Sequence, residues 1–391
     1  MRRVKISEIC EQIRGVSYKP TDVVDSLSGI PILRANNISD DVINYNNLVY
    51  IKKERISPKQ ILKKGDILIC TSSGSKNLVG KAGLITKSNF ISSFGAFCKV
   101  LRAYNTSSEY LFHYFCSDAY RDRISALSAG ANINNIKNEH IDTLEIPIYP
   151  LDKERNLLKV LNKTKVLISK RKQQLSKLDE LAKSRFIEMF GRCGEDKFGW
   201  GLKTLDDCCV INPQKTTDSR LKPGLEVSFC PMPYVSEKGE IKTDDIIIYD
   251  KVKSGFTYFA ENDVLFAKIT PCMENGKGAI ARNLKNGIGF GSTEFHVLRP
   301  KEEMITPEWL YFFTTFQQFR KDAENNMTGS AGQRRVPVNF LKKYRVSVPP
   351  KSLQYEFTRL LQQLDKSKFR IKKSLEKLEL TYKALLQEYF G

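Results

Sequence analysis

Four polar loops carry the side chains in this sequence that are best suited to bind another molecule. They read TSSGSKNLVGK (71–81), GANINNIKNEH (130–140), KITPCMENGKG (268–278) and TGSAGQRRV (328–336). Asn and Gln can form paired hydrogen bonds to adenine, Arg or Lys to guanine, and Ser, Thr and Lys to phosphate. Gly, Asn and Ser are also ordinary turn residues, so each loop alone could simply reverse the chain. As a set in a basic chain, the loops predict contact with a nucleic-acid groove.

The candidate contact residues are the amide, hydroxyl and basic side chains of these loops. A residue that touches only phosphate would support binding to every sequence, whereas one that reads a base would set discrimination at one position. In the first two loops the candidates are Ser73, Lys76, Asn77, Lys81, Asn132, Asn134, Asn135 and Lys137. In the last two they are Lys268, Thr270, Asn275, Lys277, Gln333, Arg334 and Arg335.

The usual signatures of an enzyme active site are missing from the sequence. It has no GxxxxGK[ST] loop, no HExxH and no dinucleotide fingerprint followed by a helix. The acidic pairs at 206–207 and 244–245 lie in turn-like surroundings without companion ligands, and the triplet at 212–214 is interpreted as a turn. No CxxC spacing occurs among the nine cysteines. We therefore expect no catalytic residues, no metal site and no cofactor in this chain.

The chain is strongly basic and long enough for two or more domains. Its 391 residues include 63 Lys and Arg against 44 Asp and Glu, a formal net charge of +19. This excess favours a polyanionic partner, with nucleic acid ahead of an anionic membrane surface. No apolar run approaches the ~18 residues that a membrane span needs. The odd number of cysteines is typical of reduced thiols, so we expect a cytoplasmic protein without membrane contact.

Two long Lys-rich stretches, 151–191 and 351–391, predict two long helices. Neither contains an internal proline, and apolar residues recur in both with the 3-4 spacing of a coiled-coil seam. Their ends match as well, RFIEMFG against LLQEYFG. At 1.5 Å per residue each helix would run roughly 60 Å, which suits a spacer. The predicted coiled-coil interface consists of Leu161, Ile168, Leu175, Leu178, Leu361, Ile371, Leu375 and Leu378.

The segments before the helices repeat too. GDIL (65–68) aligns with NDVL (262–265), and VLR (100–102) with VLR (297–299). One globular part followed by a long helix therefore occurs twice. Short β-rich runs predict strands at 66–70, 97–102, 226–230, 245–249 and 263–267. One helix is predicted per copy, and its aromatic stripe in the second copy (Trp309, Phe312, Phe313, Phe316, Phe319) is interpreted as core packing.

These motifs resemble those of the DNA-specificity subunit of Type I restriction–modification systems, over essentially the whole chain. The resemblance depends on the strand exits IPIYPLDKE (146–154) and VSVPPKSLQ (346–354), the GDIL/NDVL strands and the matching helix ends. The exits depart from the family's usual Pro-x-Pro-Pro-Leu pattern followed by Glu-Gln at Tyr149, Arg155, Ser347 and Lys351.

The resemblance implies an α+β fold with two repeated β-rich target recognition domains, each followed by a long helix, the two helices packing as an antiparallel coiled coil. The expected division is 1–150 and 192–350 for the domains, and 151–191 and 351–391 for the helices. It implies a subunit without enzyme activity that reads a bipartite, non-palindromic site in double-stranded DNA. Two methyltransferase subunits would dock on it, and restriction subunits could join. S-adenosylmethionine, ATP and Mg would be bound by those partners.

Two other functions are compatible with parts of the sequence. A stand-alone, double-module nucleic-acid-binding scaffold would use the same loops and helices without a methylation partner. A fused nuclease or methyltransferase would need catalytic motifs that the sequence lacks.

Overall fold

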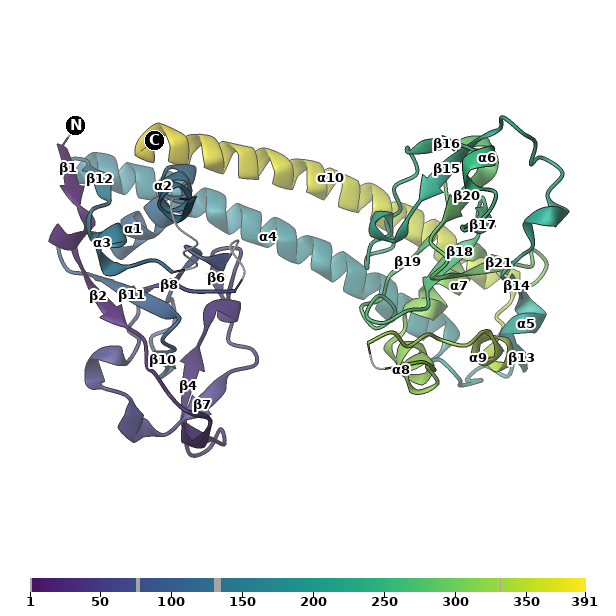
Figure 1. Ribbon diagram of the computed structural model, residues 1–391, viewed down its shortest axis with the longest axis horizontal. Helices are drawn as coiled ribbons and strands as arrows, with labels where there is room; N and C mark the ends of the chain where they lie inside the picture. Colours follow the sequence, from purple (N-terminus) through teal and green to yellow (C-terminus); the bar gives the residue numbers. More distant parts are fainter. Residues whose placement is uncertain (1, 75–77, 130–134, 331) are drawn as a thin grey trace. The chain divides into compact units, whose positions relative to one another are not determined.

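The computed structural model describes residues 2–74, 78–129, 135–330 and 332–391 (Figure 1). Its contacts divide the chain into two compact units. Unit 1 contains Met1–Gln173 and Lys372–Gly391, and unit 2 contains Gln174–Ile371. The two long helices predicted from the 3-4 spacing are confirmed as α4 (Leu151–Phe190) and α10 (Lys351–Phe390). Both units take in part of each helix, so the division into four segments at 150, 191 and 350 stays a prediction.

Unit 1 contains a globular domain built on two four-stranded sheets. The first sheet has the order β2-β11-β8-β9 and is antiparallel throughout. Its strands are β2 (Cys10–Arg14), β11 (Cys98–Ala103), β8 (Ile67–Cys70) and β9 (Ala82–Leu84). The second sheet consists of β10 (Ser93–Phe94), β4 (Ile30–Leu33), β7 (Val49–Ile51) and β3 (Val23–Val24). The remaining elements are β1 (Arg2–Lys5) paired with β12 (Glu145–Ile148), β5 (Ile38–Ser39) paired with β6 (Val42–Ile43), α1 (Ser108–Phe115), α2 (Asp118–Ala129) and α3 (Asn138–Asp142).

Unit 2 repeats this plan, which confirms the internal repeat. Its first sheet has the order β14-β21-β18-β19, with strands β14 (Cys209–Ile211), β21 (Phe295–Pro300), β18 (Val264–Ala267) and β19 (Gly278–Ile280). Its second sheet consists of β16 (Ile246–Ile248), β15 (Glu226–Cys230), β20 (Ile288–Gly291) and β17 (Thr257–Ala260). The other elements are β13 (Leu202–Thr204) paired with β22 (Arg345–Ser347), α5 (Leu205–Cys208), α6 (Tyr249–Val252), α7 (Pro307–Thr315), α8 (Gln317–Asn325) and α9 (Val338–Lys343).

The predicted strands are confirmed at all five positions, but the single helix per copy is wrong. The aromatic stripe of unit 2 is shared by α7 and α8, because Phe316 between them adopts an extended backbone. This break turns Phe319 back toward Phe313, with the ring centroids 5.3 Å apart. Trp309 and Phe313 are buried with it, as expected of core packing.

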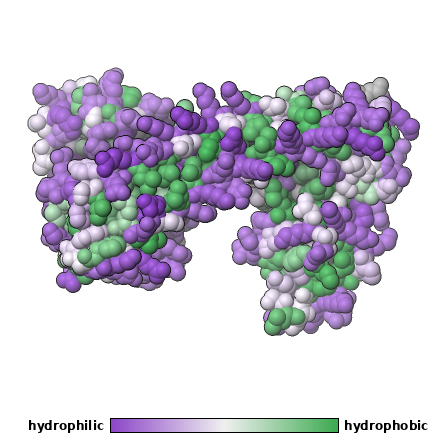
Figure 2. Space-filling model, turned by 180° about the vertical axis from the view of Figure 1, so that it is seen from behind, coloured by the Kyte–Doolittle hydropathy of each residue, from purple (hydrophilic) through white to green (hydrophobic). Residues whose placement is uncertain are grey.

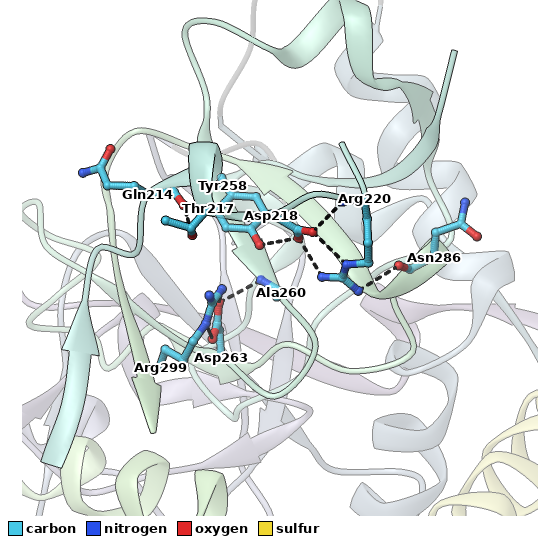
Figure 3. A network of polar contacts seen from close by, with 9 residues as sticks. All are labelled: Gln214, Thr217, Asp218, Arg220, Tyr258, Ala260, Asp263, Asn286 and Arg299. Carbon is cyan, nitrogen blue, oxygen red and sulfur yellow. Dashed lines mark hydrogen bonds and ion pairs between the residues drawn. The ribbon is translucent and has the colours of Figure 1, made fainter. Parts of the chain in front are cut away.

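A buried carboxylate–guanidinium pair joins adjacent strands at the same place in both domains. In unit 1, Arg102 donates from Nε (2.8 Å) and Nη2 (2.7 Å) to the two carboxylate oxygens of Asp66. In unit 2, Arg299 holds Asp263 with the same two distances (Figure 3). Both aspartate side chains are only 1% exposed. Paired bonds of this kind are strong and directional, so they fix β8 against β11 and β18 against β21.

The unit 2 pair belongs to a larger polar network, seen in Figure 3. Arg299 lies over the ring of Tyr258, 5.6 Å from its centroid, and Tyr258 donates from Oη to Asp218 (2.7 Å). The carboxylate of Asp218 also accepts hydrogen bonds from Nε and Nη2 of Arg220. These bonds lower the pKa of Asp218, with the hydrogen bond from Arg220 the largest cause.

The long helices complete the apolar cores of both domains. In unit 1, Phe390 near the end of α10 packs against Tyr110 and Tyr114 of α1, with ring centroids 5.2 and 5.9 Å apart. In unit 2, Phe186 and Phe190 of α4 pack against Phe357 of α10, at 5.3 and 5.5 Å. All of these rings are nearly fully buried. Each domain therefore takes part of its core from both helices.

The two helices run antiparallel. Within unit 2, Asp179 of α4 pairs with Lys368 of α10 (2.6 Å), and further along α4 Phe186 packs against the earlier Phe357 of α10 (5.3 Å between ring centroids). Advancing along one helix thus means moving back along the other. Of the predicted interface residues, Leu161 is fully buried, and those that are half-buried are Ile168, Leu175, Leu178, Leu361, Ile371, Leu375 and Leu378.

A buried histidine joins α1 to both long helices in unit 1. His113 Nδ1 lies 2.7 Å from Tyr382 Oη, and Nε2 lies 2.8 Å from Asn162 Oδ1. Asn162 donates its amide to Glu109, so its Oδ1 accepts the Nε2 proton, and in the neutral ring Nδ1 accepts from the Tyr382 hydroxyl. Burial is the main reason that the pKa of His113 falls to about 4.

The C-terminal end of α10 should be essential for the stability of the unit 1 core. Phe390→Ala removes a ring that is 1% exposed, and we expect it to destabilise unit 1 by about 3–5 kcal/mol. Amide hydrogen exchange of α1 and chemical denaturation measure this. Leu380→Ala on the same helix, where the side chain is 68% exposed, is the matched control and should change little. An equal loss of unit 1 stability in the two variants would contradict this role of Phe390.

The stability of unit 1 should fall in mild acid because of His113. An unfolded histidine has a pKa of about 6.5, so the unfolded chain binds the proton more readily than the folded one. The contribution is present above pH ~6.5 and is lost as the pH falls toward about 4, up to ~3 kcal/mol. Thermal unfolding across this range measures it. His113→Phe should flatten this part of the profile, and a profile with unchanged steepness would contradict the assignment.

Candidate nucleic-acid interface

In unit 1 the two predicted loops meet at the end of the first sheet. Ser72, just after β8, forms an isolated β-bridge with Asn135. The amide of Ile136 donates to the carbonyl of Thr71 at 2.7 Å. The second loop is therefore held against the strand end by backbone hydrogen bonds, which do not depend on side-chain identity.

In unit 2 the corresponding loops meet in the same way. Ile269, just after β18, bridges to Arg335, and the amide of Val336 donates to the carbonyl of Lys268 at 2.9 Å. A further bond joins the amide of Thr270 to the carbonyl of Arg334 at 3.0 Å. The repeat thus extends to the hydrogen bonds that bring the loops together.

In both domains a buried basic side chain donates a hydrogen bond to the second of the two meeting loops. In unit 1, Lys99 Nζ donates to the carbonyl of Ile136 (3.1 Å), and in unit 2, His296 Nε2 donates to that of Val336 (2.8 Å). Because that carbonyl can only accept, His296 carries its proton on Nε2 and accepts from the Asn212 amide at Nδ1 (3.1 Å). Burial lowers the pKa of both Lys99 and His296.

The meeting loops of unit 1 form one wall of an open cleft of about 670 Å³. Arg14 at the end of β2, Lys99, and Lys137 give the cleft its positive charge. Lys137 pairs with Glu139 at 3.4 Å, but both side chains are more than 60% exposed, so the pair is weak. We call Arg14, Thr71, Lys99, Asn135 and Lys137 edge 1. Its charge and concave shape suit the phosphate backbone of a nucleic acid.

The corresponding edge of unit 2 carries a different set of charges. Arg335 donates from Nη2 (2.8 Å) to Oε1 of Glu294 and from Nε (3.0 Å) to Oε2. This bond lowers the pKa of Glu294, while burial lowers that of the neighbouring Lys268. Arg334 lies 3.7 Å from Glu274 and 3.9 Å from Glu324. We call Lys268, Thr270, Glu294, Arg334 and Arg335 edge 2.

The structure brings some of the predicted contact residues together and separates others. Asn135 and Lys137 lie exposed on edge 1, with Ser73 half-buried beside them, and Lys81 is half-buried where its carbonyl accepts from the amide of Cys70. Lys268, Thr270, Arg334 and Arg335 converge on edge 2, with Gln333 exposed next to them. Asn275 lies in an exposed turn, and Lys277 Nζ donates to Met232 O at 3.4 Å. Lys76, Asn77, Asn132 and Asn134 lie outside the described residues.

Sequence reasoning missed Arg14, Lys99, Glu294 and His296. The alignment of the VLR strands already placed Lys99 over His296, directly before the repeated tripeptide in both copies. Two basic side chains at one aligned position inside an apolar strand were the available signal. Arg14 and Glu294 had no such signal, because Arg14 reaches the loops through its strand pairing with Lys99, and Glu294 through the hydrogen bond from the Lys268 amide to its carbonyl.

Among the described residues, no group of three or more His, Cys, Asp or Glu side chains could hold a metal ion. The described helices likewise include none that is both long and apolar enough to cross a membrane.

Comparison with known proteins identifies a family. The model of the Type I restriction modification DNA specificity domain matches residues 1–178 and 198–381. The specificity subunit of the Type I restriction enzyme StySPI from Salmonella potsdam is 28% identical over 374 residues, covering 92% of this chain and 81% of the relative. The EcoAI specificity subunit of Escherichia coli is 41% identical over 172 residues, covering 43% of this chain and 29% of the relative.

Solved structures show the same fold at low identity. The S subunit of a Type I restriction-modification system from M. genitalium aligns with a TM-score of 0.52 and 14% identity, over 100% of this chain and 96% of that one. A chain from a structural study of Type I R-M complex assembly and conformational transition aligns with a TM-score of 0.53 and 17% identity, over 100% and 97%.

If edge 1 contacts DNA phosphates, its basic residues should contribute to the salt dependence of DNA binding. We expect Lys137→Ala to make the dependence of the logarithm of the DNA-binding constant on the logarithm of salt concentration shallower by about one unit, because one phosphate contact is lost. Titrations of duplex DNA at several salt concentrations measure this. Lys64→Ala is the control, since this exposed lysine precedes β8 and does not line the cleft. A slope equal to that of the wild type would exclude a phosphate contact by Lys137.

Proposed function

Because the chain belongs to the Type I restriction–modification DNA specificity family, we propose that it is the DNA-recognition subunit of a Type I restriction–modification complex. The observation that carries this proposal is the repeated sheet edge, where two loops are held together by equivalent backbone bonds in both domains. Such an edge offers a fixed backbone with side chains aimed at a ligand. With a net charge of +19, the ligand expected is double-stranded DNA.

The two edges would read two different half-sites. Edge 1 has Thr71 and Lys99 where edge 2 and its support have Lys268 and His296. Since direct readout depends on donors and acceptors, edges of different composition select different bases. A bipartite, non-palindromic target follows. That the long helices act as the spacer between the half-sites stays a prediction.

Catalysis would reside in partner subunits. Two methyltransferase subunits, with restriction subunits able to join, would supply the chemistry and bind S-adenosylmethionine, ATP and Mg. Both long helices keep large apolar side chains exposed, among them Val166 (52%), Phe369 (66%) and Leu380 (68%). Figure 2 shows such apolar side chains among hydrophilic ones along the helices. Exposed apolar surface of this kind supports a protein interface there.

The nine cysteines support action in a reducing compartment such as the cytoplasm. All nine are free thiols in the structure, and six of them are buried. Free buried thiols are common in proteins of reducing compartments. No observation favours the stand-alone scaffold, because the relatives described above are specificity subunits of restriction systems.

A domain exchange tests the modular reading of DNA. Residues 1–150 are replaced by another recognition domain, keeping Tyr110, His113 and Tyr114, which contact the long helices in unit 1. Selection from a randomised duplex pool, with the full chain and the methyltransferase subunits that co-purify with it, should change one half of the selected motif only. A change in both halves, or in neither, would contradict independent reading by the two domains.

A further inference from the structure

One large apolar side chain stands exposed at edge 1. Phe97 lies directly before β11, between Ala96 and Cys98, which both line the cleft, and its side chain is 70% exposed. Single exposed apolar residues are common and alone indicate nothing. This one adjoins a cleft that also contains Arg14, Lys99 and Lys137.

The backbone holds Phe97 firmly in place. Its carbonyl accepts hydrogen bonds from the amides of Thr71 (2.9 Å) and Ser72 (3.1 Å) and from Thr71 Oγ1 (3.2 Å). The amide of Cys98 donates to Gly95 at 2.9 Å and closes the turn. An anchored turn presents its side chain at a defined position, which limits the entropy lost when that side chain binds.

The second domain has the same backbone arrangement with a different side chain. Glu294 stands at the equivalent position, and its carbonyl accepts from the amide of Lys268 at 2.9 Å, as that of Phe97 accepts from Thr71. Its carboxylate pairs with Arg335. An apolar ring in one domain thus replaces a polar ion pair in the other, on a shared backbone frame. This pattern suits a position whose side chain selects the ligand.

We propose that Phe97 determines specificity in the half-site read by the first domain, by apolar contact with a base, whereas Glu294 and Arg335 present polar groups at the same position in the second. The inference rests on the proposed function. Cationic groups of edge 1 would hold the phosphates, and Phe97 would meet either a thymine methyl group or the face of an unstacked base. Both offer the apolar surface that a Phe ring needs.

The test compares variants of the full chain, purified with the methyltransferase subunits that accompany it. Phe97→Ala is used to select bound sequences from a randomised duplex pool, and its affinity for the wild-type motif is then measured by titration. We expect lost discrimination at one or two positions of one half-site and an affinity about tenfold lower, with the other half-site and the salt slope unchanged. Ile91→Ala is the matched control, because Ile91 is also 70% exposed but, unlike Phe97, has no chain neighbour that lines the cleft.

Two substituted duplexes distinguish the sources of the contact. Replacing thymine by uracil removes the methyl group and should weaken the wild type but not Phe97→Ala if the methyl is read. If Phe97 unstacks a base, the fluorescence of 2-aminopurine placed in the half-site should rise when the wild type binds but not when Phe97→Ala binds. Phe97→Ala selecting the wild-type motif with unchanged affinity, or losing discrimination equally in both half-sites, overturns the inference and leaves the proposed function intact. A wild-type chain that selects no motif overturns both.

Discussion

Neither globular domain closes its apolar core alone, and the rest of the structure depends on this constraint. In unit 1 the ring of Phe390, from the far end of the chain, fills the space beside Tyr110 and Tyr114. In unit 2, Phe186 and Phe357 from different helices meet under α7. Burying rings of this size is among the largest stabilising terms in a fold. Each domain therefore takes part of its buried core from both long helices.

The two domains share a framework of hydrogen bonds and differ in the exposed side chains that this framework positions. The Asp66–Arg102 and Asp263–Arg299 pairs have equal distances, and the carbonyls before both loops accept equivalent backbone bonds. Backbone bonds and buried ion pairs tolerate changes at exposed side chains, since neither involves them. One scaffold can thus carry unlike contact surfaces, which is what reading two different half-sites requires.

Much of the fold could be predicted from the sequence because its signals are local or repeated. Strand composition, the 3-4 spacing and the shift of about 200 between copies identified the strands, both helices and the repeat. The helix break at Phe316 was not predicted, because the aromatic residues keep the spacing of a single helix through it. Core rings such as Phe186 look like ordinary helix residues until the domain that covers them is known.

The residues that meet at the two candidate edges were predicted less completely than the fold. The loops were found because Gly, Asn and basic residues cluster in sequence, and Asn135, Lys137 and Lys268 do lie at the edges. Lys277 instead donates to Met232 O, which no local pattern indicates. Glu294 was missed because its importance comes from strand pairing and from Arg335, which lies 41 positions away. Chemistry that depends on pairing between distant segments has no signature in a single sequence.

We propose that one chain directs methylation by reading two half-sites with two similar domains. A genome-wide map of N6-methyladenine in the source organism, with and without this chain, tests it most directly. The account predicts the loss of one split motif with a modified adenine on each side and with unlike halves. An unchanged map, or the loss of a continuous or palindromic motif, would contradict it.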